Sequence, residues 1–157
     1  NKTTIEADFW TAVDDLNEKS DDAGAGGMGE REFGSGVYYV YAIVDKVQLV
    51  RNLDGDEGKA DMAIDALISA MATTTPGGHR SSFAHHTYAS YIVVERADRV
   101  AGNLMLPAFE SPAEGTRDAI EKLKSAFASV SKAYGIAPPA GVVSVPDGVG
   151  SLPDLLS

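Results

Sequence analysis

The residues best suited to chemistry lie together in one window of the chain, residues 73–95. The window contains all three histidines of the protein, His79, His85 and His86, together with Arg80, Ser81 and Ser82. No acidic residue occurs between Asp65 and Glu95, although the whole chain carries a net charge of −10. Imidazole is a common metal ligand, and a guanidinium can bind a phosphate through two hydrogen bonds. The window could therefore hold a metal ion or an anion.

The metal and catalytic interpretations are disfavoured by spacing. His85 and His86 are adjacent, and adjacent side chains on a strand point to opposite faces. The sequence has no H-E-x-x-H helix, and the window has no carboxylate that could orient a histidine beside a serine nucleophile. The glycines of residues 24–29 lack the Lys-Ser or Lys-Thr of a phosphate-binding loop, and the acid pairs at 14–15 and 21–22 lie in polar sequence. We predict no catalytic residue, no metal site and no cofactor.

A binding interpretation agrees better with the residue types. The glycines at 77–78 allow close approach of the backbone to a ligand, and Arg80, Ser81 and Ser82 can donate to a phosphate. Near the amino end, Phe9, Trp10 and Met28 are apolar side chains that could stack on bases or wedge between them. The alternative for Phe9 and Trp10 is ordinary core packing.

Composition limits the class of protein. A length of 157 residues fits one domain with a real core, and no apolar run is long enough to span a membrane. The sequence has no cysteine, which suits a reducing compartment, so a cytoplasmic location is expected. The acidic charge argues against a freestanding domain that binds nucleic acid through a broad basic patch. We also expect that the chain is a fragment of a longer protein, because it begins at Asn1 within ordinary folded sequence.

The amino-terminal third permits two interpretations before a clear strand. Phe9, Trp10, Val13 and Leu16 follow helical spacing, but residues 8–13 could instead form an extended arm. The glycine-rich residues 24–36 predict a protruding loop or loose hairpin. Residues 37–44 (VYYVYAIV) are almost wholly β-branched or aromatic, which predicts a central strand.

Helices and shorter strands alternate in the rest of the chain. Asp45 is a candidate N-cap for a short helix that Gly55 ends, and apolar spacing predicts a helix over residues 59–73. The run at 89–95 predicts a strand, which with the strand at 37–44 and the intervening helix would form a crossover or part of a ferredoxin-like sheet. A second helix should start near Ser111 or Thr116 and end at Gly135. Residues 142–145 favour an edge strand.

Three blocks of sequence together carry a resemblance to a known family. These blocks are residues 8–16 (DFWTAVDDL), residues 27–29 with 32–42 (GMG, EFGSGVYYVYA) and residues 76–85 (PGGHRSSFAH), with a weaker fourth match at 108–112 (AFESP). They resemble the CasC family, the repeated backbone subunit of the type I-E CRISPR Cascade complex. Together they span most of residues 8–134.

The resemblance implies a non-enzymatic, guide-RNA-binding subunit with an α+β fold. Its domains would be a thumb (1–36) and the carboxy-terminal part of an RRM-like, ferredoxin-like palm (37–157). Copies would stack along the guide RNA, pair it with a target DNA strand and contact other Cascade subunits. Each thumb would displace one base at regular intervals. By matching position, Trp10 and Thr11 would lie at the displaced base, Met28 would be the wedge, and Phe9 a neighbour. Arg80, Ser81 and Ser82 would contact the guide.

The sequence also departs from the family pattern. Family members commonly have Lys-Gln in place of His79-Arg80, Arg in place of Val40 and Asn in place of Pro107, so fewer cations would reach the RNA at these points. The amino-terminal part of the pattern, with its first palm strand and a basic helix, is absent. We therefore expect that these 157 residues alone form an incomplete RNA site. The alternative is a structural or protein-interaction α/β domain with no role in nucleic-acid binding.

Overall fold

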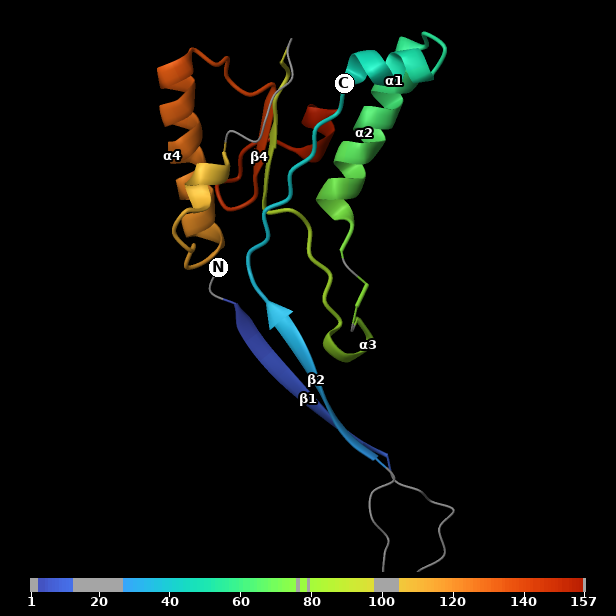
Figure 1. Cartoon of the computed structure of the whole chain (residues 1–157), viewed down its shortest axis with the longest axis vertical. Coiled ribbons are helices and arrows are strands. Elements are labelled where there is room, and N and C mark those ends of the chain that lie inside the picture. The colour runs from blue at the N-terminus through green and yellow to red at the C-terminus, as the bar shows by residue number, and fades with distance from the viewer. Residues whose placement is uncertain (1–2, 13–26, 76, 79, 98–104, 157) are drawn as a thin grey trace, which may run out of the picture.

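The computed structural model describes residues 3–12, 27–75, 77–78, 80–97 and 105–156. A long hairpin comes first in the chain, followed by helices that flank a small second sheet (Figure 1). Both sheets are antiparallel and two-stranded, and four α-helices and two 3-10 helices accompany them in the described residues. This confirms the predicted α+β class, whereas an RRM-like sheet is not formed by these residues.

The hairpin projects away from the rest of the molecule. It consists of β1 (Thr4–Ala12) and β2 (Gly27–Ser35), and its register runs from Thr4 opposite Ser35 to Ala12 opposite Gly27 (Figure 1). The extended-arm interpretation is therefore confirmed for Phe9 and Trp10, and the helical one is wrong there. Val13 and Leu16 lie outside the described residues. The strand is favoured because β2 provides an antiparallel partner for the backbone hydrogen bonds of β1. A helix of only two turns, with no surface to pack against, would be less stable.

The second sheet lies between the flanking helices. Strand β3 (Tyr91–Val94) pairs with β4 (Gly141–Ser144), which confirms strands close to both predicted positions. Helix α4 (Thr116–Tyr134) lies to one side of this sheet, preceded by the 3-10 helix η1 (Leu106–Phe109). Gly135 ends α4 with a left-handed φ of 65°, as its sequence position predicts. A final 3-10 helix, η2 (Leu152–Leu155), inserts Leu155 into the core.

Helices α1 and α2 lie on the other side of the small sheet (Figure 1). Helix α1 (Lys46–Asn52) begins at Asp45, whose carboxylate accepts a hydrogen bond from the Gln48 N–H at 2.9 Å, so the predicted N-cap is confirmed. Gly55, at a φ of 85°, forms the turn after it. Helix α2 (Glu57–Thr73) starts two residues before the predicted boundary, because Asp56 caps it through the Lys59 N–H.

The central strand predicted over residues 37–44 is wrong for the described chain. These residues belong to no strand, and Tyr38 and Val40 are 74% and 70% exposed. A segment with high strand propensity forms a strand only where a neighbouring strand edge accepts its backbone hydrogen bonds. Among the described residues, β3 pairs with β4 and not with this segment. The predicted crossover from this segment to β3 is therefore not formed.

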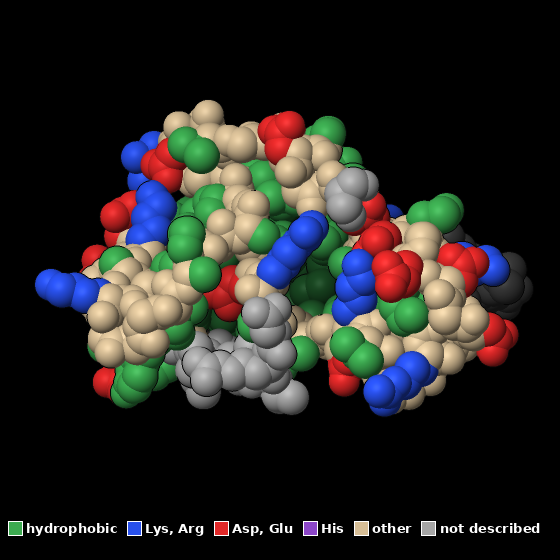
Figure 2. Space-filling model, turned by 90° about the horizontal axis from the view of Figure 1, so that it is seen from above, with side chains coloured by type: hydrophobic (Ala, Val, Ile, Leu, Met, Phe, Trp, Pro, Cys, Tyr) green, Lys and Arg blue, Asp and Glu red, His purple; other side chains and the backbone are tan. Residues whose placement is uncertain are grey.

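An open hollow of about 1930 Å³ is lined by both this segment and β3. Apolar side chains from α2, β3 and α4 line it, among them Ile64, Ile92 and Phe127. Seen from above, hydrophobic side chains cover its floor between the α4 side and the α1 side (Figure 2). The lining of the hollow has the apolar character of a protein interior.

An ion-pair network fixes α4 to the turn that follows β4. The Lys124 ammonium lies 2.8 Å from an Asp147 oxygen and 3.0 Å from a Glu121 oxygen, and the Ser144 hydroxyl donates to the same Asp147 oxygen at 2.6 Å. Lys124 and then Ser144 lower the pKa of Asp147 below 3.8. The stabilisation from this carboxylate is therefore present above pH 3.8 and is lost as the pH falls through its lower folded-state pKa.

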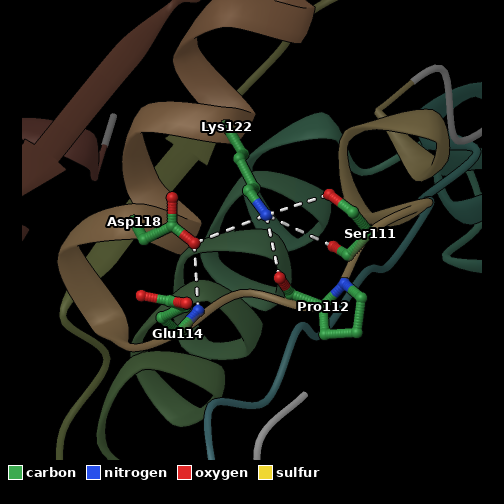
Figure 3. Close-up of polar contacts among 5 residues, drawn as sticks. All are labelled: Ser111, Pro112, Glu114, Asp118 and Lys122. Atoms are coloured by element: carbon green, nitrogen blue, oxygen red, sulfur yellow. Dashed lines mark hydrogen bonds and ion pairs between the residues drawn. The ribbon is translucent and has the colours of Figure 1, made fainter.

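Lys122 organises the loop before α4. Its ammonium donates to the Ser111 hydroxyl at 3.0 Å and to the Pro112 carbonyl at 2.9 Å, and it lies 3.4 Å from the Asp118 carboxylate (Figure 3). The same Asp118 oxygen accepts from the Glu114 N–H at 3.0 Å, which with Lys122 lowers the pKa of Asp118. The last two residues of the block at 108–112, Ser111 and Pro112, both accept hydrogen bonds from the Lys122 ammonium. This gives the block a structural role.

Replacing Lys122 with methionine should lower the melting temperature by about 5 °C, since the variant keeps the apolar stem and leaves several oxygens without their charged donor. Differential scanning calorimetry measures this change. Lys132→Met, at an exposed position in the last turn of the same helix, is the matched control. Equal melting temperatures for the two variants would show that the loop does not depend on Lys122.

Candidate nucleic-acid interface

The far end of the hairpin presents different side chains on its two faces. Directly opposed residues of an antiparallel pair point to the same face, and successive residues alternate. Thr11 is opposite Met28 and Phe9 is opposite Glu30, so these four residues share one face. Phe9 and Met28 are 74% and 78% exposed, so neither belongs to the core of the described chain. They form an apolar patch on a projecting ribbon.

Trp10 lies on the opposite face, where it is opposite Gly29. Its indole covers Gly29 so closely that a Cβ at that position would overlap the ring. The absence of a side chain at Gly29 lets the indole lie across the neighbouring strand, and Trp10 remains 43% exposed. The register thus separates the adjacent residues Trp10 and Thr11, which the sequence suggested as one contact, onto two faces of the ribbon.

The second group of predicted binding residues lies beside the other end of the hairpin. Arg80 begins the single-turn helix α3 (Arg80–Phe83), near the end of β2 (Figure 1). Arg80 and Ser81 are exposed, Ser82 lies within α3, and His79 is outside the described residues. The sequence predicted a loop here, and the short helix was missed because four residues carry no periodic signal.

Hydrogen bonds tie the two ends of this segment together. The Thr75 hydroxyl donates to the Thr87 carbonyl at 2.8 Å and accepts from the Thr87 N–H at 3.2 Å. Further along, the Ala89 N–H donates to the Ala72 carbonyl at 2.8 Å. These bonds hold Thr75 and Thr87 together near the end of α2, at the two ends of the loop that carries Arg80.

The two described histidines contact different groups. His85 lies against Phe33 of β2, with ring centroids 5.2 Å apart, whereas His86 packs edge-on against Tyr88. The Arg80 guanidinium donates to His86 Nδ1 at 3.4 Å, which requires an unprotonated nitrogen because arginine cannot accept. Among the residues that the structure describes, no group of three His, Asp or Glu side chains could hold a metal ion.

The structure thus brings the predicted residues together in two groups, one at each end of the hairpin. None of the described predicted residues lines the hollow. Sequence reasoning missed Gly29, Phe33 and Phe83. The alternation in residues 28–33, with Met28, Glu30 and Glu32 on one face and Gly29, Arg31 and Phe33 on the other, is a signal that could have revealed the first two.

The sequence pattern of the CT1975-like protein family matches residues 1–150, nearly the entire chain. The protein belongs to this family. No curated protein matches the sequence significantly.

Solved structures similar to this family member come from RNA-guided complexes. A chain described as "CRISPR RNA-guided surveillance complex" is 31% identical, with a TM-score of 0.73 over 98% of this protein and 59% of that chain. A chain described as "CRISPR RNA-guided surveillance complex, pre-nicking" is 32% identical, with a TM-score of 0.75 over 94% of this protein and 45% of that chain. The protein therefore spans about half the length of these solved chains.

These matches confirm the predicted resemblance to a CRISPR-associated family at this coarser level, and the assignment to the CasC family of type I-E remains a prediction. In the described residues, no helix combines the length and the apolar character needed to cross a membrane.

Proposed function

We propose that the protein is part of a non-catalytic backbone subunit of a type I-E CRISPR surveillance complex in the cytoplasm. In this role it binds guide RNA, oligomerises along it, and displaces bases with the hairpin while the guide pairs with a target DNA strand. The observation that carries the proposal is the projecting hairpin with exposed apolar side chains on both faces of its far end. Family membership and the similarity to chains of RNA-guided complexes support the same class of partner.

The hairpin has the chemistry of a wedge between bases. Aromatic side chains stack on bases of any sequence, and apolar side chains can be inserted between them. A ribbon with Trp10 on one face and Thr11 and Met28 on the other offers such a surface to the bases on both sides. Displacement of one base would leave its two neighbours in contact with opposite faces of the ribbon.

The charges of the hairpin favour bases over phosphates as its ligands. Glu6, Asp8, Glu30 and Glu32 lie along the two strands, with Arg31 as the one cation of the described hairpin. Carboxylates repel a phosphate backbone, so a nucleic acid cannot lie along the strands through its phosphates. Contact between bases and the uncharged side chains at the far end of the hairpin agrees with this distribution of charge. Phosphates would instead be bound beside α3, by Arg80 together with Ser81 and Ser82.

The alternative is a structural or protein-interaction domain without a nucleic-acid role. The exposed side chains of the 37–44 segment favour it, because large apolar patches mark interaction surfaces. The two functions differ in their dependence on salt, since neutralisation of phosphates by cations makes binding weaken as salt increases.

Replacing Arg80 with alanine in the full-length protein should reduce the salt dependence of guide-RNA binding. Loss of one phosphate contact lowers the slope of log K against log[salt] by about 0.7 for single-stranded RNA, for all guide sequences alike. Fluorescence anisotropy over a series of salt concentrations measures the slope. Arg51→Ala, at an exposed position in the last turn of α1, is the matched control. An unchanged slope for Arg80→Ala would remove this residue from the interface, and a wild-type protein that does not bind RNA would refute the proposed function.

A further inference from the structure

An aromatic cluster joins the base of the hairpin to α3. The Phe33 ring of β2 stacks on the Phe83 ring of α3, with centroids 4.4 Å apart and planes inclined by 21°. The His85 ring lies on the same Phe33 ring at 5.2 Å. All three side chains are partly buried. The cluster therefore links the projecting ribbon to the loop that carries Arg80.

The backbone between Phe83 and His85 is strained at Ala84. Ala84 has a φ of 48°, in the left-handed region that a residue with a side chain seldom adopts, and its N–H donates to the Arg80 carbonyl at 2.8 Å. This turn lets Phe83 and His85, two residues apart, reach one ring of β2. Such strain persists where the surrounding contacts determine the conformation, and it often occurs at functional positions.

The cluster lies on a defined face of the hairpin. Phe33 is opposite Glu6, four residues along the strand from the Trp10–Gly29 pair, and so shares the face of Trp10. Arg80 starts the helix that Phe83 ends. The phosphate-binding candidate therefore sits on the Trp10 side of the ribbon, and Thr11 and Met28 point to the other side.

We propose that Phe33, Phe83 and His85 form a joint that sets the direction of the hairpin relative to Arg80, with Phe83 as a positioning residue for guide-RNA recognition. The proposal rests on the proposed function for its ligand, a single strand of RNA held at a phosphate by Arg80 and at its bases by the far end of the hairpin.

Because the hairpin is long, a small rotation at the joint produces a large displacement of its far end. Met28 lies five residues beyond Phe33, about 17 Å along an extended strand. A rotation of about 10° at the joint moves the far end by about 3 Å, which approaches the separation of two stacked bases along a strand. Two contacts on one RNA strand keep a constant spacing only if this rotation is prevented. Without the joint, Arg80 would still bind a phosphate, but the hairpin would no longer meet a fixed base.

The mechanical part is tested by the distance between spin labels in the full-length protein. Labels at Glu30→Cys, on the face away from Phe33, and at Ser125→Cys, exposed on α4, report the hairpin direction by pulsed electron paramagnetic resonance. We expect a narrow distance distribution in the parent protein, one at least twice as broad after Phe83→Ala, and a narrow one again after Phe83→Tyr. Because Phe33 and Phe83 act through one contact, Phe33→Ala together with Phe83→Ala should broaden it no further. An unchanged distribution in Phe83→Ala would overturn the joint.

The functional part is tested by base-resolved chemical probing of guide RNA in the assembled complex. Phe83→Ala should lose the regular pattern of displaced bases and keep the salt slope that Arg80 contributes, and Phe83→Tyr should restore the pattern. A regular pattern in Phe83→Ala would overturn the positioning role even if the distances broaden. A wild-type complex with no displaced bases would instead refute the proposed function, and the label distances would still decide whether the joint exists.

Discussion

Replacing Trp10 and Met28 with alanine together is expected to remove regular base displacement from the guide RNA and to weaken guide binding about 30-fold or more. Each stacked or wedged base contributes about 1–3 kcal/mol by alanine substitution, and the two residues lie on opposite faces of the ribbon. Because they share no face, the two single variants should have additive effects. Chemical probing of the reconstituted complex measures displacement, and a titration of guide RNA measures affinity.

The matched control for this pair is Ile5→Ala. Ile5 is an exposed apolar residue of β1 that lies near the base of the ribbon, away from Trp10 and Met28. It should leave displacement and affinity within about twofold of the parent protein. If the double variant instead kept assembly, RNA protection and target-strand pairing unchanged, Trp10 and Met28 would not be the wedge.

Replacing Gly29 with alanine should have an effect close to that of Trp10→Ala, about tenfold on guide binding, although it removes no atom. The new methyl group would overlap the Trp10 indole. Because the methyl group is attached to the main chain of β2 and cannot move, the indole must leave the face of the ribbon. Trp10 is the one tryptophan of the 157 residues. Its fluorescence in this chain therefore reports the change directly, as a red-shifted emission and stronger quenching by acrylamide.

Gly34→Ala is the control in the same strand. A Cβ at Gly34 would lie 3.7 Å from the Thr3 Cγ2 atom, an ordinary contact, so the fluorescence should not change. The same emission spectrum and quenching in the two variants would mean that Gly29 does not hold the indole in place.

The sequence predicted well those elements whose signals are local. The Asp45 cap, the apolar spacing of α4 and its end at Gly135 depend on residues within a few positions of each other, and the structure confirms them. For residues 8–13 the sequence permits a helix or an extended arm, since Phe9 and Trp10 fit helical spacing and no local signal decides between the two. The register of the hairpin, and with it the separation of Trp10 from Thr11, depends on a partner strand that lies beyond a 14-residue interval.

Two features could not be predicted from local patterns. Residues 37–44 have high strand propensity, but a strand forms only where another edge accepts its hydrogen bonds. The Phe33–Phe83 contact joins residues fifty positions apart that carry no distinguishing motif. The roles of Phe9, Trp10, Thr11, Met28, Arg80, Ser81 and Ser82 in RNA binding remain predictions, as do the boundaries of thumb and palm at residue 36.

The 37–44 segment and the edge of β3 that faces away from β4 also affect how copies of the chain would associate. Tyr38, Val40 and Ile43 are exposed, and β-branched and aromatic residues of this kind pair readily with any available strand edge. Short segments with high strand propensity and little charge are also typical of aggregating sequences. Copies of the chain would therefore tend to associate with one another through this segment and this edge.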